Sequence, residues 1–321
     1  MSRIVFFILS ISMFTSVRAG ENQAFPLRIP KSFQTASQPT KFFVSPTSRV
    51  LRSMEISLSG GSSYGVEQNE NGLLTRFGLG MGGVAEIEFS TTQVVNQLTG
   101  DETRFPSRTL KVQLVPERFA RSPFIPRIAV QLRTSSWAAV VDRDTPIAGR
   151  LSHDYALNHK ESNLEALNLR SRFTTLHMVA GKEWELGGFY FGYSLTDVRT
   201  KEGGQWIFDN TDYSYRYYLI PEMKKNILKP FGGILIKANA STRLLAEIYT
   251  VPNYRYNIKN KSIDITRAWV GIAGVRFTMM RWLSWDAGVR YLSTYDGIAD
   301  AEICLNLNLI LPLKSPSQDL H

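Results

Sequence analysis

Four histidines are the residues with which this chain could carry out acid–base chemistry: His153, His159, His177 and His321. A histidine with a serine two positions later on a strand edge would place a general base within reach of a nucleophile. None of the four has that neighbour. His159 precedes Ser162, but the spacing is wrong and the pair falls in an expected long loop. His177 lies within an expected strand, where we expect it to pack or to face the interior, so we predict no catalytic residue and no enzymatic activity.

Metal and cofactor motifs are also missing from the sequence. It contains no His-Glu-x-x-His, no EF-hand-type acidic loop and a single cysteine, Cys304, so it cannot form an intramolecular disulfide. A glycine-containing run at 78–83 is explained by a strand and a hairpin turn, because no helix follows it as a dinucleotide loop would require. We therefore predict no metal and no cofactor.

Charged residues recur instead at alternate positions, opposite apolar ones. Glu86 and Glu88, for example, alternate with Ile87 and Phe89. Side chains on one strand face alternate in this way, and mixed charges on an inner wall either pair with one another or line a water-filled path. We predict that the following residues face an interior: Glu55, Arg76, Glu86, Glu88, Lys111, Arg127, Arg133, Glu247, Arg276, Asp286, Arg290 and Glu302.

The elements that must position these residues are strands with one apolar and one polar face. Residues 301–311 show the pattern most clearly, since every odd position is apolar while Glu302, Asn306 and Asn308 stand between them. Segments of about 9–11 residues with this alternation are typical of a transmembrane β-barrel. The sequence therefore predicts an all-β fold, an antiparallel up-and-down barrel of about 12 strands, near 54–59, 73–81, 85–93, 107–116, 126–137, 168–182, 187–198, 229–238, 242–250, 267–277, 283–291 and 301–311.

One stretch leaves the strand count open. Residues 205–220 resemble a hairpin with its turn at Asp209 and Asn210. It is either an extension beyond the membrane or two further spanning strands, which would make the count 14. The links between strands alternate between short ones, as at 82–83 and 239–241, and long ones, as at 94–106 and 251–266. Barrels of this class have short turns in the periplasm and long loops outside, so we expect both ends of the chain in the periplasm.

The first residues predict export. A short basic start, an apolar run from Ile4 to Val17 and small residues before the cut resemble a secretory signal peptide over 1–19, cleaved after Ala19. Residues 20–51 contain several prolines and no sustained periodicity, so they are either an irregular periplasmic leader or a plug in the lumen. The barrel is predicted over 52–313, followed by a short tail over 314–321.

The net charge and the aromatic residues indicate which molecules could surround the chain. The formal charge of +9 could indicate nucleic acid, but an exported chain meets anionic lipopolysaccharide and polysaccharide instead. Tyr213, Tyr215 and Tyr217 could stack on sugar rings, or could mark a strand end at the membrane interface. Five tryptophans near expected strand ends favour an aromatic girdle: Trp137, Trp184, Trp269, Trp282 and Trp285.

Glycines and charged inward residues precede a short turn and the next strand in two stretches, 71–89 and 243–249. In this pattern the chain resembles Gram-negative outer-membrane β-barrel proteins, including the exopolysaccharide-associated barrels similar to YjbH. The resemblance implies an outer-membrane location and partners in membrane lipid, lipopolysaccharide, the barrel assembly machinery and envelope polysaccharide. We expect a passive channel, or a structural or accessory role in envelope polymer export. A glycan- or partner-binding barrel is the first alternative, and a lipid-acting hydrolase is the second.

Overall fold

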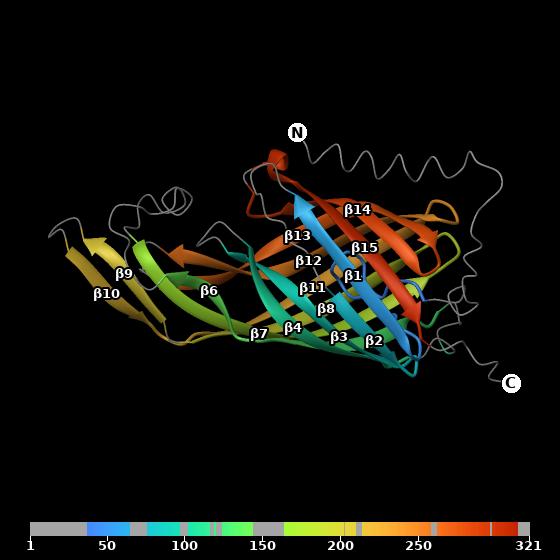
Figure 1. Ribbon diagram of the computed structural model, residues 1–321, viewed down its shortest axis with the longest axis horizontal. Helices are drawn as coiled ribbons and strands as arrows, with labels where there is room; N and C mark the ends of the chain where they lie inside the picture. Colours follow the sequence, from blue (N-terminus) through green and yellow to red (C-terminus); the bar gives the residue numbers. More distant parts are fainter. Residues whose placement is uncertain are drawn as a thin grey trace, which may run out of the picture.

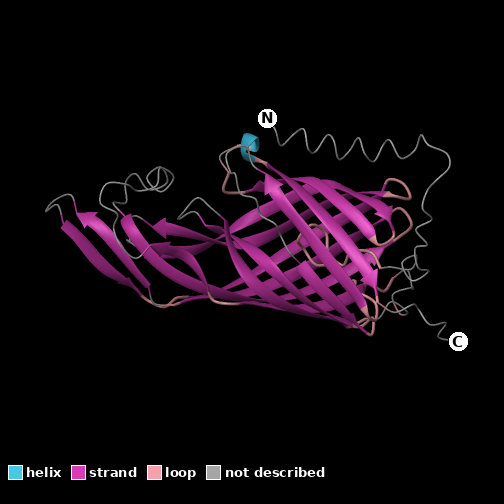
Figure 2. Ribbon diagram, viewed as in Figure 1, coloured by secondary structure: helices cyan, strands magenta, loops and turns pink. Residues whose placement is uncertain are grey.

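The structure is a computed structural model that describes residues 37–64, 76–96, 102–115, 119, 124–143, 164–201, 203–209, 214–257, 262–295 and 297–313. These residues form β-strands almost throughout, with one short 3-10 helix, η2 (Ile298–Asp300) (Figures 1 and 2). The strands are β1 (Glu55–Tyr64), β2 (Arg76–Met81), β3 (Ala85–Asn96), β4 (Glu102–Gln113), β5 (Arg127–Ser135), β6 (Ala138–Arg143), β7 (Leu164–Glu183), β8 (Gly187–Thr200), β9 (Gly203–Asp209), β10 (Ser214–Ile220), β11 (Lys224–Lys237), β12 (Thr242–Asn257), β13 (Ser262–Met280), β14 (Leu283–Leu292) and β15 (Glu302–Pro312).

Twelve of the described strands close into one antiparallel barrel. The order around the ring is β1-β2-β3-β4-β5-β7-β8-β11-β12-β13-β14-β15, and β15 then pairs with β1. The predicted fold class and its count of 12 strands are confirmed. The hairpin predicted at 205–220 is β9 and β10, which extend the sheet from β7 beyond the barrel wall (Figure 1). The alternative of 14 spanning strands is therefore wrong.

Four connections at one end of the barrel are short, and the fifth, between β4 and β5, spans 114–126. Links of two to four residues at 82–84, 184–186, 238–241 and 281–282 join neighbouring strands there, and the described chain also begins and ends at this short-turn end (Figure 2). Gly82 and Gly83 adopt φ values of 64° and 69°, which a tight hairpin requires and glycine adopts without steric cost.

Two predicted loops at the opposite end are wrong. Most of 94–106 and of 251–266 is strand, because β3, β4, β12 and β13 continue past the expected ends. The outward face of these continuations is not consistently apolar. The period-2 signal therefore fades although backbone pairing persists.

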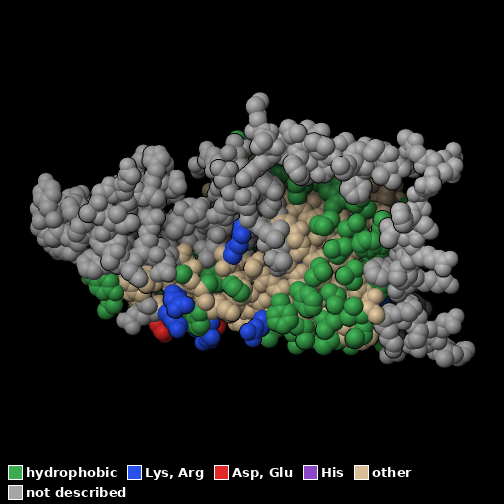
Figure 3. Space-filling view, in the orientation of Figure 1, with side chains coloured by type: hydrophobic (Ala, Val, Ile, Leu, Met, Phe, Trp, Pro, Cys, Tyr) green, Lys and Arg blue, Asp and Glu red, His purple; other side chains and the backbone are tan. Residues whose placement is uncertain are grey.

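The outside of the barrel carries an apolar surface. Paired leucines and isoleucines form one row across nine consecutive strands of the wall: Leu311, Ile56, Leu79, Ile87, Leu110, Leu132, Leu176, Leu195 and Leu228. Leu132 and Leu195 are 47% and 45% exposed, and Figure 3 shows hydrophobic side chains covering the wall toward the short-turn end. A barrel that lies in lipid has apolar residues on its outer face and charged residues on its inner face, as this one does. Among the described residues, no helix is long and apolar enough to cross a membrane.

The barrel narrows toward the end opposite the short turns, where several strands continue beyond the wall (Figure 1). β11 and β12 pair over 232–237 and 243–248, and in the described residues the pairing between them stops there. β12 then crosses the interior to pair in parallel with β3, where Asn253 lies beside Val95. Pro230 and Pro252 lie just past the last β11–β12 pair, and a proline without an N–H is tolerated on an unpaired strand edge.

An apolar cluster fills the interior at this constriction. It is formed by Val94, Phe105, Val140, Leu169, Phe173, Val198, Ile220, Tyr254, Ile263 and Ile265. The Tyr254 hydroxyl lies 2.6 Å from Ser171 Oγ, which satisfies its polar atom inside the cluster. We call this region the constriction.

Candidate functional site

Residues 37–53 lie inside the barrel at its short-turn end and form a plug. The plug has no regular secondary structure beyond one bridge between Lys41 and Pro46, yet Phe42, Phe43 and Ser48 are buried. Its polar backbone needs partners wherever it is shielded from water. The inward charged residues of the wall supply many of them.

Glu86 and Glu88 of β3 hold the plug from one side. Glu86 accepts hydrogen bonds from Thr40 Oγ1 at 3.2 Å and from the Leu51 backbone N–H at 2.9 Å. It also forms an ion pair with Lys111 of β4 at 3.3 Å. Glu88 forms an ion pair with Lys41 of the plug. Two carboxylates at alternate positions of one strand therefore point inward together, and both bind the plug.

Glu247 of β12 and Arg276 of β13 hold it from the other side. The backbone N–H groups of Val44 and Ser45 donate to the two carboxylate oxygens of Glu247 at 2.9 and 2.8 Å. Arg276 donates to the carbonyl oxygens of Lys41 and Phe42 at 3.2 and 3.0 Å. Arg276 is itself fixed by Asp286 of β14, at 2.6 and 2.9 Å. The tip of the plug is thus bound through its backbone, which any sequence could offer.

Glycines on the inner wall leave room for the plug side chains. A Cβ on Gly233 would lie 2.6 Å from the Phe42 ring, and a Cβ on Gly288 would lie 2.8 Å from that of Phe43. Phe42 also packs edge-on against Tyr190, with 5.3 Å between ring centroids. Close approach of this kind requires a wall residue without a side chain.

The other predicted interior residues form further pairs. Arg127 lies 3.0 Å from Glu183, which also pairs with Arg49 of the plug. Glu55 accepts hydrogen bonds from the backbone N–H groups of Ser37 and Arg52, each at 2.9 Å.

Arg290 forms a buried ion pair with Glu302 at 2.9 Å. Of the 12 predicted residues, 10 are buried, and Arg76 and Arg127 are partly buried.

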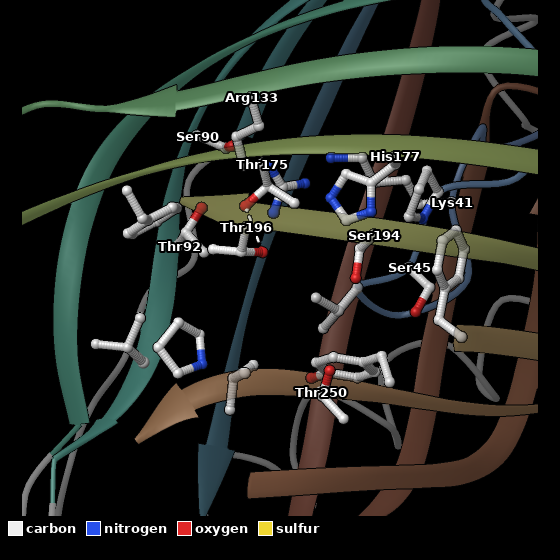
Figure 4. Close-up of a pocket in the computed structure, with 18 of the residues that line it drawn as sticks. Lys41, Ser45, Ser90, Thr92, Arg133, Thr175, His177, Ser194, Thr196 and Thr250 are labelled. Atoms are coloured by element: carbon white, nitrogen blue, oxygen red, sulfur yellow. Dashed lines mark hydrogen bonds between the residues drawn. The ribbon is translucent and has the colours of Figure 1, made fainter. Parts of the chain in front are cut away.

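A cavity of about 80 Å³ lies between the plug tip and the constriction, with room for several water molecules. Its basic lining residues are Lys41, Arg76, Arg133, His177 and Arg290, and no acidic residue is among the described residues that line it. Figure 4 shows Arg133, Thr175, His177 and Ser194 close together on its wall. Phe173, Phe231, Val251 and Pro252 add apolar surface to the same cavity.

His177 and Ser194 are neighbours across β7 and β8, although no sequence motif joins them. They do not form a hydrogen-bonded pair. Both ring nitrogens of His177 are buried without a hydrogen-bond partner, and Ser194 Oγ donates to the Lys229 carbonyl at 3.4 Å. The ring of His177 packs edge-on against Phe231, with 5.5 Å between centroids. The serine here lacks the base contact that activates a nucleophile.

Several residues singled out in the sequence fall outside this site or outside the description. His153, His159, Ser162, His321, Tyr213 and the cleavage position Ala19 lie outside the described residues, as do the tail 314–321 and most of the segment 20–51. Tyr217 of β10 is 51% exposed, and Tyr215 is on the same strand. Cys304 is buried on the inner face of β15. In the part of the chain described, no group of three His, Cys, Asp or Glu residues is placed to hold a metal ion.

Sequence reasoning missed Lys41, Tyr249 and the hydroxyl residues Thr175 and Thr196 as parts of the cavity. The alternation of β7 and β8 places these threonines inward, but only the strand register brings them level with Arg133. Lys41 is in the segment without periodicity. No pattern in that segment indicates which of its side chains reach the wall.

Comparisons with known proteins assign neither a family nor a function to this chain. No family model and no curated protein matches the chain. Solved structures with some similarity are outer-membrane barrels. One is the translocator domain of the autotransporter NalP from Neisseria meningitidis, at 8% identity and a TM-score of 0.43, covering 80% of this chain and 85% of that one. Another is the monoaromatic hydrocarbon channel CymD, at 9% identity and a TM-score of 0.43, covering 82% and 89%.

The toluene transporter TbuX from Ralstonia pickettii is 10% identical, with a TM-score of 0.37 and coverage of 88% and 92%. Similarity at this level assigns neither a substrate nor a partner to this chain. The resemblance to the YjbH-like barrels stays a prediction.

Proposed function

We propose that this chain is an outer-membrane barrel that passes small solutes through its lumen, with the plug as a removable barrier at the short-turn end and the constriction as a second barrier. The apolar row on the outer wall and the signal-like residues 1–19 support the location. The observation that carries the proposal is the way the plug is held. Carboxylates and arginines of the wall bind the plug, and the plug is not one of the 12 paired strands of the barrel.

A plug that is bound by side chains of the wall can move without unfolding the barrel. Each polar contact contributes about 0.5–1.5 kcal/mol, or about 1.5–3 kcal/mol where one partner is charged. The plug makes many such contacts, so the open state that we propose breaks only a few of them at a time. The wall pairs persist when the plug moves.

An accessory role in envelope polymer export stays a prediction. For a polymer to pass, the plug would have to leave the lumen and the constriction would have to open, because β3 and β12 meet across the lumen. A small solute needs a smaller displacement. Passage of small solutes is therefore the function that this interior supports best.

Planar-bilayer conductance of the full chain tests the proposal, with Glu247→Ala as the variant. Removing this carboxylate takes away the acceptor of the Val44 and Ser45 N–H groups, so we expect more frequent or larger openings than in the wild type. Glu185→Ala, at an exposed turn position, is the matched control and should behave as wild type. If a heat-modifiability gel shows that the wild type and Glu247→Ala are both folded and neither conducts, the barrel has a structural role instead.

A further inference from the structure

From the cavity between plug and constriction we propose a binding site for a small organic carboxylate with an apolar body, anchored by Arg133. This inference gives a substrate class to the lumen of the proposed channel. Binding itself does not require that the barrel conduct. The two can therefore fail separately.

The first argument is charge. Glu88 faces three cations, Lys41, Arg76 and Arg133. Its carboxylate is bonded to Lys41, and Arg76 Nε lies 3.9 Å away. Glu247 also interacts electrostatically with Arg76, so two negative charges serve three positive ones here. A buried cation without a full counter-charge is costly, and an anion in the cavity would balance it.

The second argument is the number of unsatisfied polar atoms around this one space. Arg133 is 8% exposed and its Nε has no hydrogen-bond partner. Both nitrogens of His177 and the Thr91 hydroxyl are also buried without partners. All three residues line the cavity. Buried polar groups normally have partners, so their concentration here indicates a polar ligand.

The third argument selects the class of anion. A guanidinium presents a planar fork of donors that matches a carboxylate, and the hydroxyls of Thr175, Ser194 and Thr196 lie nearby. Phe173, Phe231 and Val251 form apolar wall in the same cavity. An inorganic anion would leave this apolar surface unused. A carboxylate on a small aromatic or branched body would use both parts.

Calorimetric titration of the folded full chain in detergent tests the site, with benzoate as the probe. Benzyl alcohol supplies the same ring without the charge, and inorganic phosphate supplies charge without the ring. We expect saturable binding of benzoate and at least tenfold weaker binding of both comparison ligands. Arg133→Gln should weaken benzoate binding by about tenfold or more, because it removes a charge-assisted hydrogen bond.

Arg267→Gln is the matched control, since Arg267 is exposed on β13 outside the cavity. It should bind benzoate as the wild type does. The inference is overturned if the folded wild type shows no saturable benzoate binding, if phosphate binds as tightly as benzoate, or if Arg133→Gln binds like the wild type. Loss of conductance with binding retained would instead overturn the channel proposal alone.

Discussion

Asn253 of β12 lies beside Val95 of β3 in a parallel pairing, although β3 and β12 are on opposite sides of the 12-strand ring. The remaining pairs of the barrel wall are antiparallel. Opposite walls therefore touch through their backbones. Because Tyr254 follows directly, its ring is placed in the middle of the apolar cluster of the constriction. The constriction is thus built from the wall itself and does not depend on a separate segment.

Tyr254→Ala should destabilise the barrel and loosen the constriction. The ring is fully buried, and truncating a large buried aromatic side chain costs about 3–5 kcal/mol. Tyr254→Phe keeps the ring and loses only the contact with Ser171, so it should cost about 1 kcal/mol. Urea unfolding in lipid vesicles measures both changes. Phe124→Ala, at a position that is 91% exposed, is the control, and equal destabilisation of all three variants would contradict the assignment.

The fold could be predicted from the sequence because lipid imposes a strict rule on each strand. Leu132 and Leu176 face outward while Gln131 and Thr175 face inward, and this alternation is visible without a structure. A signal that repeats on every spanning strand also locates the 12 strands that show it. The extensions β6, β9 and β10 lie beyond the wall, where the rule does not apply. The choice between 12 and 14 strands therefore stayed open until the pairing was known.

The site could be predicted only in part. The inward charges of Glu86, Glu88 and Glu247 follow from alternation, but what they bind does not. The sequence left open whether residues 20–51 are a leader or a plug. The plug, which includes the described residues 37–51 of that segment, is bound largely through backbone groups that carry no sequence signal. The cavity depends on the register of β7 and β8 and on the crossing of β12, and single strands do not reveal either.

Gly233→Val should displace the plug while leaving the wall intact. A Cβ at this position would lie 2.6 Å from the Phe42 ring, which is too close for any side chain. Gly271→Ala is the matched control on the neighbouring wall, because a Cβ there meets nothing within 4 Å. Hydrogen exchange of residues 37–53 should accelerate in Gly233→Val and stay at the wild-type rate in Gly271→Ala. Unchanged protection in Gly233→Val would show that the plug is not seated against β11.

Asp286→Asn should cost far more stability than Asp197→Asn. Asp286 is fully buried and forms a two-point ion pair with Arg276, which also holds the plug backbone. Removing one partner of a buried pair leaves an uncompensated charge and costs about 3–5 kcal/mol. Asp197 pairs with Arg199 at 2.9 Å on a more exposed part of β8, and such pairs contribute about 0–1 kcal/mol.

Urea unfolding in lipid vesicles separates the two ion pairs. Replacing both partners, Arg276→Met with Asp286→Leu, should recover part of the loss, since no buried charge then lacks its partner. The double variant should regain stability of the barrel wall but not binding of the plug, because the Lys41 and Phe42 carbonyl oxygens still lack their donor. Hydrogen exchange of residues 37–53 should therefore stay fast in the double variant. A double variant with wild-type protection of these residues would show that Arg276 supports only the wall.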